Sequence, residues 1–271
     1  MKLRFPLLSL LLVSMPSFSA DESGNFQVRD MIGIGLAYQS VEADLRATAG
    51  DLPEVEVDLD DLGIKDEDLS WAIEGRWRFK PRWALVGLAY QFSQDGNQSV
   101  KRDFNFDGKD FQAGASVDTE LSIDTYILDV MYSAYRSPRT EILVGGGIHA
   151  IDLEASIKGR AFVGETEREA ATGSSDLLAP LPNLRAQAYY KINDNWDLGV
   201  SVGWLSANAG DYDGGFIYLH PRVTWGGGES WALSLGYQYV NIDITQEKSS
   251  TRENEFNMDF QGPTLLLDYR F

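Results

Sequence analysis

The chain of 271 residues has no cysteine, only two histidines, and a shortage of positive charge. Without cysteine, disulfides, thiolate metal sites and lipoprotein anchoring are excluded. The 23 basic residues face 41 acidic ones, and a net charge of −18 argues against a nucleic-acid partner. No apolar run after residue 20 reaches the roughly 18 residues that a membrane-spanning helix needs. A helical membrane protein is therefore excluded.

The first twenty residues, MKLRFPLLSLLLVSMPSFSA, have the pattern of a secretory signal peptide. Lys2 and Arg4 precede an apolar stretch that is too short to cross a bilayer, and small residues follow it. We expect cleavage after Ala20, with cleavage after Ser19 as the alternative. The predicted organisation is thus a signal peptide over residues 1–20 and one domain over residues 21–271.

Apolar residues alternate with small or polar ones through most of that domain. This alternation is the signature of strands, because successive side chains in a strand point to opposite faces. In one stretch, for example, the bulky stripe consists of Val86, Leu88, Tyr90 and Phe92, and Gly87 lies on the other face. Ten such stretches occur, at 31–39, 71–79, 84–92, 125–133, 142–149, 183–192, 196–204, 217–225, 231–239 and 264–271.

The face opposite the apolar stripes carries charge that a soluble sandwich core could not hold unpaired. The apolar stripes are also about nine residues long, the length with which a tilted strand crosses hydrocarbon. We therefore predict an all-β fold, a transmembrane antiparallel up-and-down barrel of about ten strands, with eight as the alternative. Its predicted lumen-facing residues are Glu74, Arg76, Arg78, Asp129, Arg185, His220 and Arg222.

The connections alternate between short and long, as they do in outer-membrane barrels. The predicted short turns are FKPRW, YRSPRTE, INDNW and WGGGESW, and the predicted long polar loops are 49–68, 93–118, 163–179 and 245–257. Tryptophans lie beside the short turns and near the other rim, as in an interfacial aromatic girdle. We expect the short turns in the periplasm and the long connections outside the cell.

The final stretch, GPTLLLDYRF, resembles the sorting signal of Gram-negative outer-membrane proteins, which the barrel-assembly machinery reads. The residues that carry this resemblance are Leu265, Leu267, Tyr269 and Phe271. More broadly, residues 21–271 resemble a poorly characterised family of small proteobacterial outer-membrane barrels, through VDLDDLGIKDED, GGGIHAIDLEASI, APLPNLRAQAYY and GDYDG. The resemblance implies a fold and a location in the outer membrane, and no activity.

The sequence leaves two enzymatic alternatives, an outer-membrane protease and a lipid hydrolase. Omptin proteases pair two aspartates with an Asp-x-His element, and the chain offers Asp58 with Asp60 and Asp211 with Asp213. The Asp-x-His element is missing, however, because Tyr218 precedes His220 by two residues and Gly147 precedes His149 by two. Lipid hydrolysis would need a serine beside a histidine, and Ser156 and Ser201 sit in no nucleophile motif.

The acidic stretch DLPEVEVDLDDLGIKDED lacks the spacing of a calcium loop, so we interpret it as a solvated loop. We thus predict no catalytic residue, metal site or cofactor. The predicted role is structural, or narrow passage or binding of small solutes, with a lipid hydrolase or protease at the rim as the alternative. The expected partners are outer-membrane lipid, lipopolysaccharide, the barrel-assembly machinery during biogenesis and small solutes. A filled, ion-paired lumen is favoured slightly over a conducting one.

Overall fold

The computed structural model describes residues 24–49, 55–58, 67–99, 104–106, 109–111, 116–163, 166–209, 212–226, 230–249 and 252–271. The predicted signal peptide lies outside these residues. In the part of the chain so described, no helix is long and apolar enough to cross a membrane.

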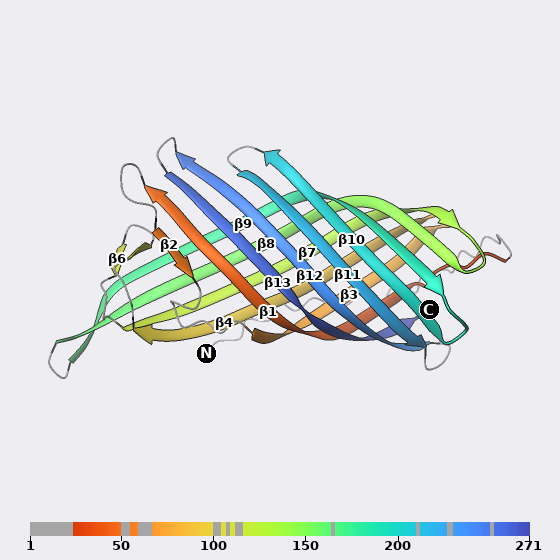
Figure 1. Ribbon diagram of the computed structural model, residues 1–271, viewed down its shortest axis with the longest axis horizontal. Coiled ribbons are helices and arrows are strands. Elements are labelled where there is room, and N and C mark those ends of the chain that lie inside the picture. The colour runs from red at the N-terminus through yellow and green to blue at the C-terminus, as the bar shows by residue number, and fades with distance from the viewer. Residues whose placement is uncertain are drawn as a thin grey trace.

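Ten long strands form one closed antiparallel barrel (Figure 1). They are β1 (Met31–Ala49), β3 (Glu67–Lys80), β4 (Trp83–Ser99), β7 (Ser116–Arg136), β8 (Thr140–Val163), β9 (Thr166–Lys191), β10 (Trp196–Ala209), β11 (Tyr212–Gly226), β12 (Trp231–Ser249) and β13 (Arg252–Arg270). Each strand pairs with its neighbours in the chain order, and β13 pairs with β1 from Arg270 opposite Met31 to Arg252 opposite Ala49. The predicted all-β barrel of ten strands is confirmed, and the eight-strand alternative was wrong.

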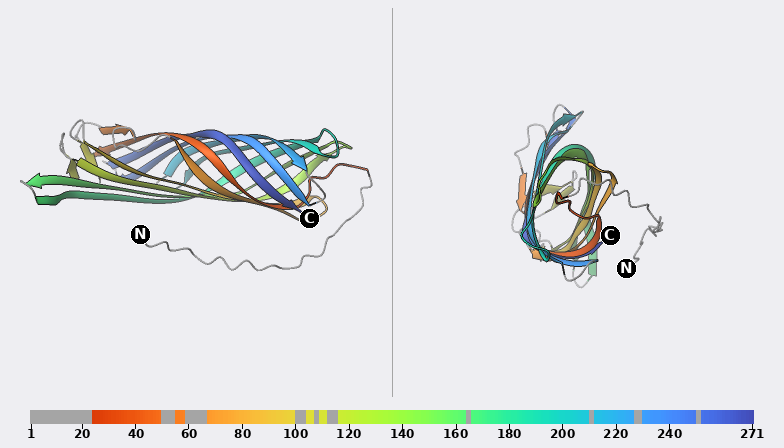
Figure 2. Two further views of the ribbon diagram at one scale, coloured as in Figure 1. Left: turned by 90° about the horizontal axis from the view of Figure 1, so that it is seen from below. Right: turned by 90° about the vertical axis from the view of Figure 1, so that its right-hand side faces the viewer.

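Three short strands are not part of the closed ring of ten strands. Strand β2 (Val55–Asp58) pairs with the far end of β1, and β5 (Phe104–Phe106) pairs with β6 (Lys109–Phe111) in a separate hairpin. Viewed end-on, the ten long strands curve round into an elongated ring (Figure 2, right). The C-terminus lies at the end of the ring that carries the short connections, here called the short-turn end (Figures 1 and 2).

The outer surface of the barrel is apolar and the inner surface is mixed. Along β12, for example, Trp231, Leu233 and Leu235 are exposed, whereas Ala232 and Ser234 between them are buried. Exposed aromatic and aliphatic side chains of this kind occur on all ten long strands. Such an arrangement is stable only where the exterior contacts lipid. In an aqueous surrounding, water would contact a continuous apolar belt, which is unfavourable.

One strand faces the opposite way from the prediction. Since residues paired directly across an antiparallel ladder share a face, Val86 opposite Arg76 and Asp129 must point inward. The bulky stripe of β4, which we expected against lipid, is therefore inside, and Gly87 is outside opposite Leu128. The alternation misled because both faces of β4 are apolar: Trp83 and Leu85 still present an apolar face to lipid.

The end opposite the short turns, here called the long-hairpin end, has less loop than we predicted. Segments 163–179 and 245–257 were expected to be loops, but β8, β9, β12 and β13 continue through nearly all of them. Strands β8 and β9 project furthest (Figures 1 and 2). The ladder between β9 and β10 nevertheless ends at Leu184 opposite Trp204, and that between β3 and β4 ends at Ala72 opposite Tyr90. Beyond these seams the wall continues as two separate groups of strands.

The two groups pack against each other through an apolar interior. Phe92 on β4 meets Phe260 on β13 edge to face with ring centroids 6.1 Å apart, although β3 and β1 separate these two strands in the barrel. His149 on β8 likewise meets Phe216 on β11, at 4.2 Å. Buried aliphatic side chains surround these contacts, namely Val117, Leu121, Ile123, Ile151, Val240, Ile242 and Met258. The long-hairpin end is thus closed by a sandwich-like core rather than by the polar lumen that the sequence suggested.

The lipid-facing assignment predicts a depth-dependent cost for charge on the outer surface. Val200 lies midway between Trp196 and Trp204 on the outer face of β10, so we expect Val200→Arg to destabilise the barrel by roughly 2–4 kcal/mol. Glu154→Arg, on the exposed outer face of β8 beyond the aromatic rim, should cost about 1 kcal/mol or less. Reversible unfolding in vesicles measures both. Equal costs would mean that the belt does not contact lipid.

Candidate functional site

The seven predicted lumen residues all lie inside the barrel wall. Among them, Arg76, Asp129, Arg185, His220 and Arg222 are buried, and the side chains of Glu74 and Arg78 are largely buried in ion pairs. These residues come from four strands around the ring, β3, β7, β9 and β11. The alternation of the sequence placed each of them on the inner face, but it could not say which would meet.

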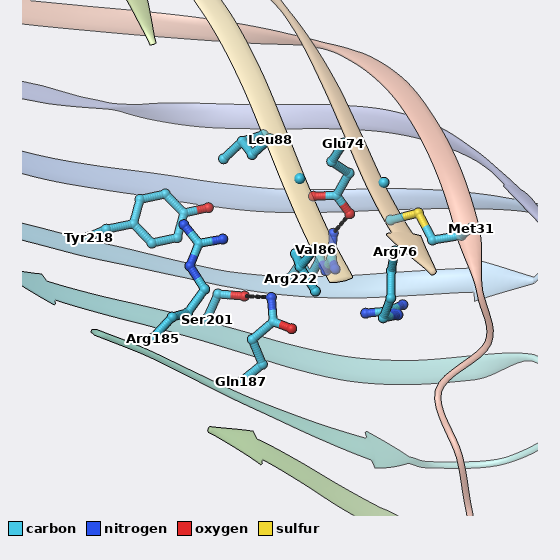
Figure 3. Close-up of a pocket in the computed structure, with 12 residues that line it drawn as sticks. Met31, Glu74, Arg76, Val86, Leu88, Arg185, Gln187, Ser201, Tyr218 and Arg222 are labelled. Carbon is cyan, nitrogen blue, oxygen red and sulfur yellow. Dashed lines mark hydrogen bonds and ion pairs between the residues drawn. The ribbon is translucent and has the colours of Figure 1, made fainter. Parts of the chain in front are cut away.

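Tyr189 is the centre of one group of charges. Its hydroxyl accepts hydrogen bonds from Arg76 Nη1 at 2.7 Å and from Arg222 Nη2 at 3.3 Å. The Arg76 guanidinium also lies 4.9 Å from the centre of the Tyr189 ring, within the range of a cation–π contact. Arg222 pairs in turn with Glu74 on β3, across the barrel (Figure 3). Two arginines thus share one tyrosine, and one of them, Arg222, also pairs with a carboxylate.

A second buried pair joins β7 to β9. Arg185 Nε lies 3.0 Å from Asp129 Oδ2, and both side chains are almost completely excluded from solvent. The two groups form a close ion pair without the alignment of a hydrogen bond. The guanidinium carbon of Arg185 also lies 5.1 Å from the centre of the Tyr218 ring. The positive charge is therefore compensated on one side by a carboxylate and on the other by an aromatic face.

His220 links the charged interior to the closing strand. Its Nδ1 lies 2.9 Å from the Tyr218 hydroxyl, and its Nε2 lies 2.9 Å from Thr264 Oγ1 on β13. Space for the ring depends on Gly236, where an added Cβ would come within 2.6 Å of His220 Nε2 and 2.8 Å of Thr264 Oγ1. A larger residue at position 236 would displace the histidine.

The short-turn end holds a charged cluster that the sequence reasoning missed. Glu141, which we assigned to a turn, is buried and accepts hydrogen bonds from Ser133 Oγ at 2.6 Å, Arg78 Nη2 at 3.0 Å and Arg136 Nε at 3.1 Å. A fourth donor is the backbone N of Val28, at 2.8 Å. The only signal in the sequence was the position of Glu141 two residues before Leu143, on the inner face of β8.

The segment before β1 enters the barrel through this cluster. Val28 packs in one buried group with Ala84, Val86, Met131, Leu143 and Tyr189. Arg76 Nε donates to the carbonyl of Arg29 at 3.1 Å, and the backbone N of Arg78 donates to Asp30 Oδ1 at 3.0 Å. The segment 26–30 is thus fixed to the wall at the short-turn end, with Val28 buried inside the barrel.

The charged groups that the structure describes in the middle of the barrel leave little space between them. A cavity of about 10 Å³ lies between the two groups of charges, lined among others by Glu74, Arg185, Ser201 and Tyr218 (Figure 3). This is about the room that one water molecule needs. A larger cleft of about 510 Å³ opens at the short-turn end beside the segment 26–30. It is lined on the barrel side by Lys191, Asp194, Asn195, Asp197, Gly226 and Arg270.

Charges along this cleft pair with one another. Lys191 Nζ lies 2.7 Å from Asp194 Oδ1, and Arg270 Nη1 lies 3.4 Å from Asp197 Oδ2. A hydrogen bond from Lys191, together with its positive charge, lowers the pKa of the exposed Asp194 carboxyl. The cleft therefore has a nearly balanced charge at its rim.

The catalytic alternatives gain no assembled site in the described residues. Ser201 does lie directly opposite His220 on the neighbouring strand, but its hydroxyl accepts a hydrogen bond from Gln187 at 3.1 Å. Both ring nitrogens of His220 are already in hydrogen bonds, and His149 packs against Phe216. Asp60 and Asp211 lie outside the described residues, as do the side chains of Asp58 and Asp213. Among the residues that the structure describes, no acidic or histidine cluster could hold a metal ion.

Comparison with solved structures found several similar chains. The outer membrane protease OmpT of Escherichia coli is similar with a TM-score of 0.57 and 11% identity, over 90% of this chain and 99% of that protein. The transport unit of the autotransporter AIDA-I of Escherichia coli gives a TM-score of 0.43 at 8% identity, over 94% of each chain. The toluene transporter TbuX of Ralstonia pickettii gives 0.36 at 8%, over 90% of each chain. At 11% identity the likeness to OmpT concerns the fold alone.

A sequence comparison with curated proteins gave no match. The model of one protein family does match, over residues 5–220, and that family is the outer membrane protein beta-barrel domain. The match covers most of the chain, agrees with the closed ten-strand barrel, and assigns the apolar belt to the bacterial outer membrane. The chain therefore belongs to the outer membrane protein beta-barrel domain family.

Proposed function

We propose that this protein is a non-conducting barrel of the outer membrane with a structural, non-enzymatic role. The observation that carries the proposal is the filled interior, where the cavity between Glu74 and Arg185 has about 10 Å³. A hydrated ion needs a continuous path, and a barrel of about ten strands has room for one only if its inward side chains are small. Here arginines, tyrosines and phenylalanines from strands that are not neighbours in the wall meet instead.

The closure is repeated at three levels along the barrel. The segment 26–30 is bound to Glu141 at the short-turn end, which we assign to the periplasmic side. Paired charges around Tyr189 and Tyr218 fill the middle. The apolar contact of Phe92 with Phe260 closes the long-hairpin end, which we assign to the cell exterior. An open channel would require all three levels to rearrange, and this supports a plug in preference to a narrow pore.

The outer surface supports two kinds of partner for such a protein. The exposed apolar belt fits the hydrocarbon of outer-membrane lipid, and the projecting strands β8 and β9 extend to the depth of lipopolysaccharide headgroups. The alternating residues of β13 that end at Phe271 fit recognition by the barrel-assembly machinery during biogenesis. Passage or binding of small solutes is the competing role, and conductance decides between them.

The first test is single-channel recording of the refolded protein in planar bilayers. We expect no discrete ion conductance in the wild type, because the three levels of closure exclude a water-filled path. Val28→Gly together with Glu141→Gln, which frees only the periplasmic level, should remain silent for the same reason. Steady, ion-selective openings of the wild type would establish a narrow channel and reject the plug.

The second test measures the charges of the interior by stability. Asp129→Ala and Arg185→Ala should each destabilise the barrel by about 3–5 kcal/mol, because each leaves the other charge buried without compensation. The exposed pair of Glu120 and Lys158, 3.5 Å apart, provides the control, and Glu120→Gln should cost less than about 1 kcal/mol. A small cost at Asp129 would mean that water screens the interior.

The third test concerns assembly. Phe271 is exposed on the lipid-facing surface, and its backbone N donates to the carbonyl of Asp30 at 3.1 Å. Deletion of Phe271 removes one hydrogen bond of the closing seam, so refolding in detergent should change little. Assembly in cells should nevertheless fall strongly, with degradation in the periplasm, whereas Phe271→Tyr should assemble normally. Equal amounts of membrane-inserted protein for deletion and wild type would contradict an assembly signal.

A further inference from the structure

Positive charge gathers on one part of the periplasmic rim. Lys80 ends β3 and Arg82 lies in the turn to β4, and the turn between β7 and β8 carries Arg139. These two turns adjoin, because the backbone N of Ser133 donates to the carbonyl of Arg82 at 2.7 Å and Arg136 donates to the carbonyl of Pro81. Lys80, Arg82 and Arg139 are here called the basic rim.

Aromatic side chains lie directly above the basic rim on the lipid-facing surface. Trp77 and Phe79 on β3 are both exposed, with ring centroids 6.0 Å apart. Trp83 on β4 is exposed and meets Tyr132 on β7 at 5.0 Å. Aromatic rings of this kind sit at the level of lipid headgroups. The basic rim is therefore held at the depth where headgroup phosphates lie.

The positive charge of the basic rim does not extend over the rest of the described surface. The next turn along the rim, between β9 and β10, carries Asp194, which pairs with Lys191, and the backbone N of Lys191 donates to the carbonyl of Arg139 at 2.7 Å. At the other end of the barrel the described outer faces of β7 and β8 carry Glu120, Glu154 and Lys158, with Lys158 paired to Glu120. Since the chain as a whole carries −18, anionic molecules are repelled from most of its surface. The basic rim is the exception among the described turns.

We propose that the basic rim binds the phosphate headgroup of anionic phospholipids in the leaflet that faces the periplasm. The aromatic rings anchor the acyl chains and the glycerol region, while the ammonium of Lys80 and the guanidinium of Arg139 contact the phosphate from two adjacent turns. Among the other turns that the structure describes at this end, the one between β9 and β10 carries the acidic Asp194 beside Lys191, so its charge is balanced. The inference depends on the membrane orientation of the barrel and is independent of whether the lumen conducts.

The test is quenching of tryptophan fluorescence by lipids with brominated acyl chains. The full chain is refolded into vesicles of phosphatidylcholine that contain a minor fraction of phosphatidylglycerol, and bromine is placed on one lipid or the other. The difference between the wild type and Trp83→Phe isolates the signal of the tryptophan nearest the basic rim. We expect Trp83 to be quenched more by brominated phosphatidylglycerol than its bulk fraction predicts, and less so at high salt.

The variant pair is Lys80→Gln with Arg139→Gln, and the control is Lys158→Gln, which removes an exposed positive charge at the other end. Each basic residue near an anionic surface contributes about fivefold in affinity, so the double variant should lose the preference by roughly an order of magnitude. Lys158→Gln should retain it. An unchanged preference in the double variant, or no preference in the wild type, overturns the proposal. The proposal is also overturned if the wild type shows no lipid preference but binds isolated peptidoglycan, and the double variant loses that binding.

Discussion

The structure depends on one constraint, which is that every backbone N–H and C=O group in the hydrocarbon must be paired within the protein. A sheet meets this demand only when it has no edge. Here the long ladder between β1 and β13 removes the edge, and the hydrogen bond from Phe271 to Asp30 extends the same seam to the short-turn end. Once the ring is closed, the inner faces of ten strands are fixed relative to one another. The inward side chains then have to fill the space that the ring encloses.

The interior solves this packing problem with charge in the middle and apolar residues at one end. Charged groups inside a ten-strand ring lose most of their hydration, so each must find a partner on another strand. Arg76 and Arg222 share Tyr189, and Arg185 pairs with Asp129 across two ladders. Room for these long side chains comes from small residues on the same face, as Gly236 shows beside His220. The pairs therefore bind the wall together as well as filling it.

At the long-hairpin end the constraint of the membrane no longer applies, and the architecture changes accordingly. The ladders between β9 and β10 and between β3 and β4 stop, since unpaired backbone there can bind water. Pro180 and Pro182 fall on β9 just beyond the last residue paired to β10, where the missing N–H groups cost nothing. The two groups of strands then pack face to face through Phe92 and Phe260, as in a soluble sandwich.

The sequence by itself determined the class of fold, the ten strands and the outward face of nine of them. Period-two alternation reports which residues share a face, and the charged side of each stripe could not have faced lipid. It also placed all seven predicted lumen residues on the inner face. The prediction from sequence was wrong for the orientation of β4, because both faces of that strand are apolar and alternation cannot distinguish them. It was also wrong for segments 163–179 and 245–257, where strands replaced the expected loops.

Only the tertiary structure decided which inner residues meet. Alternation fixes the face of a residue, whereas the partner of Arg185 depends on the register between β7, β8 and β9, and that of Arg222 on the curvature that brings β3 near β11. The entry of segment 26–30 into the barrel and its bonds to Glu141 likewise join residues more than a hundred positions apart. Contacts between residues so far apart in the sequence leave no short-range sequence pattern, because closure of the ring brings them together.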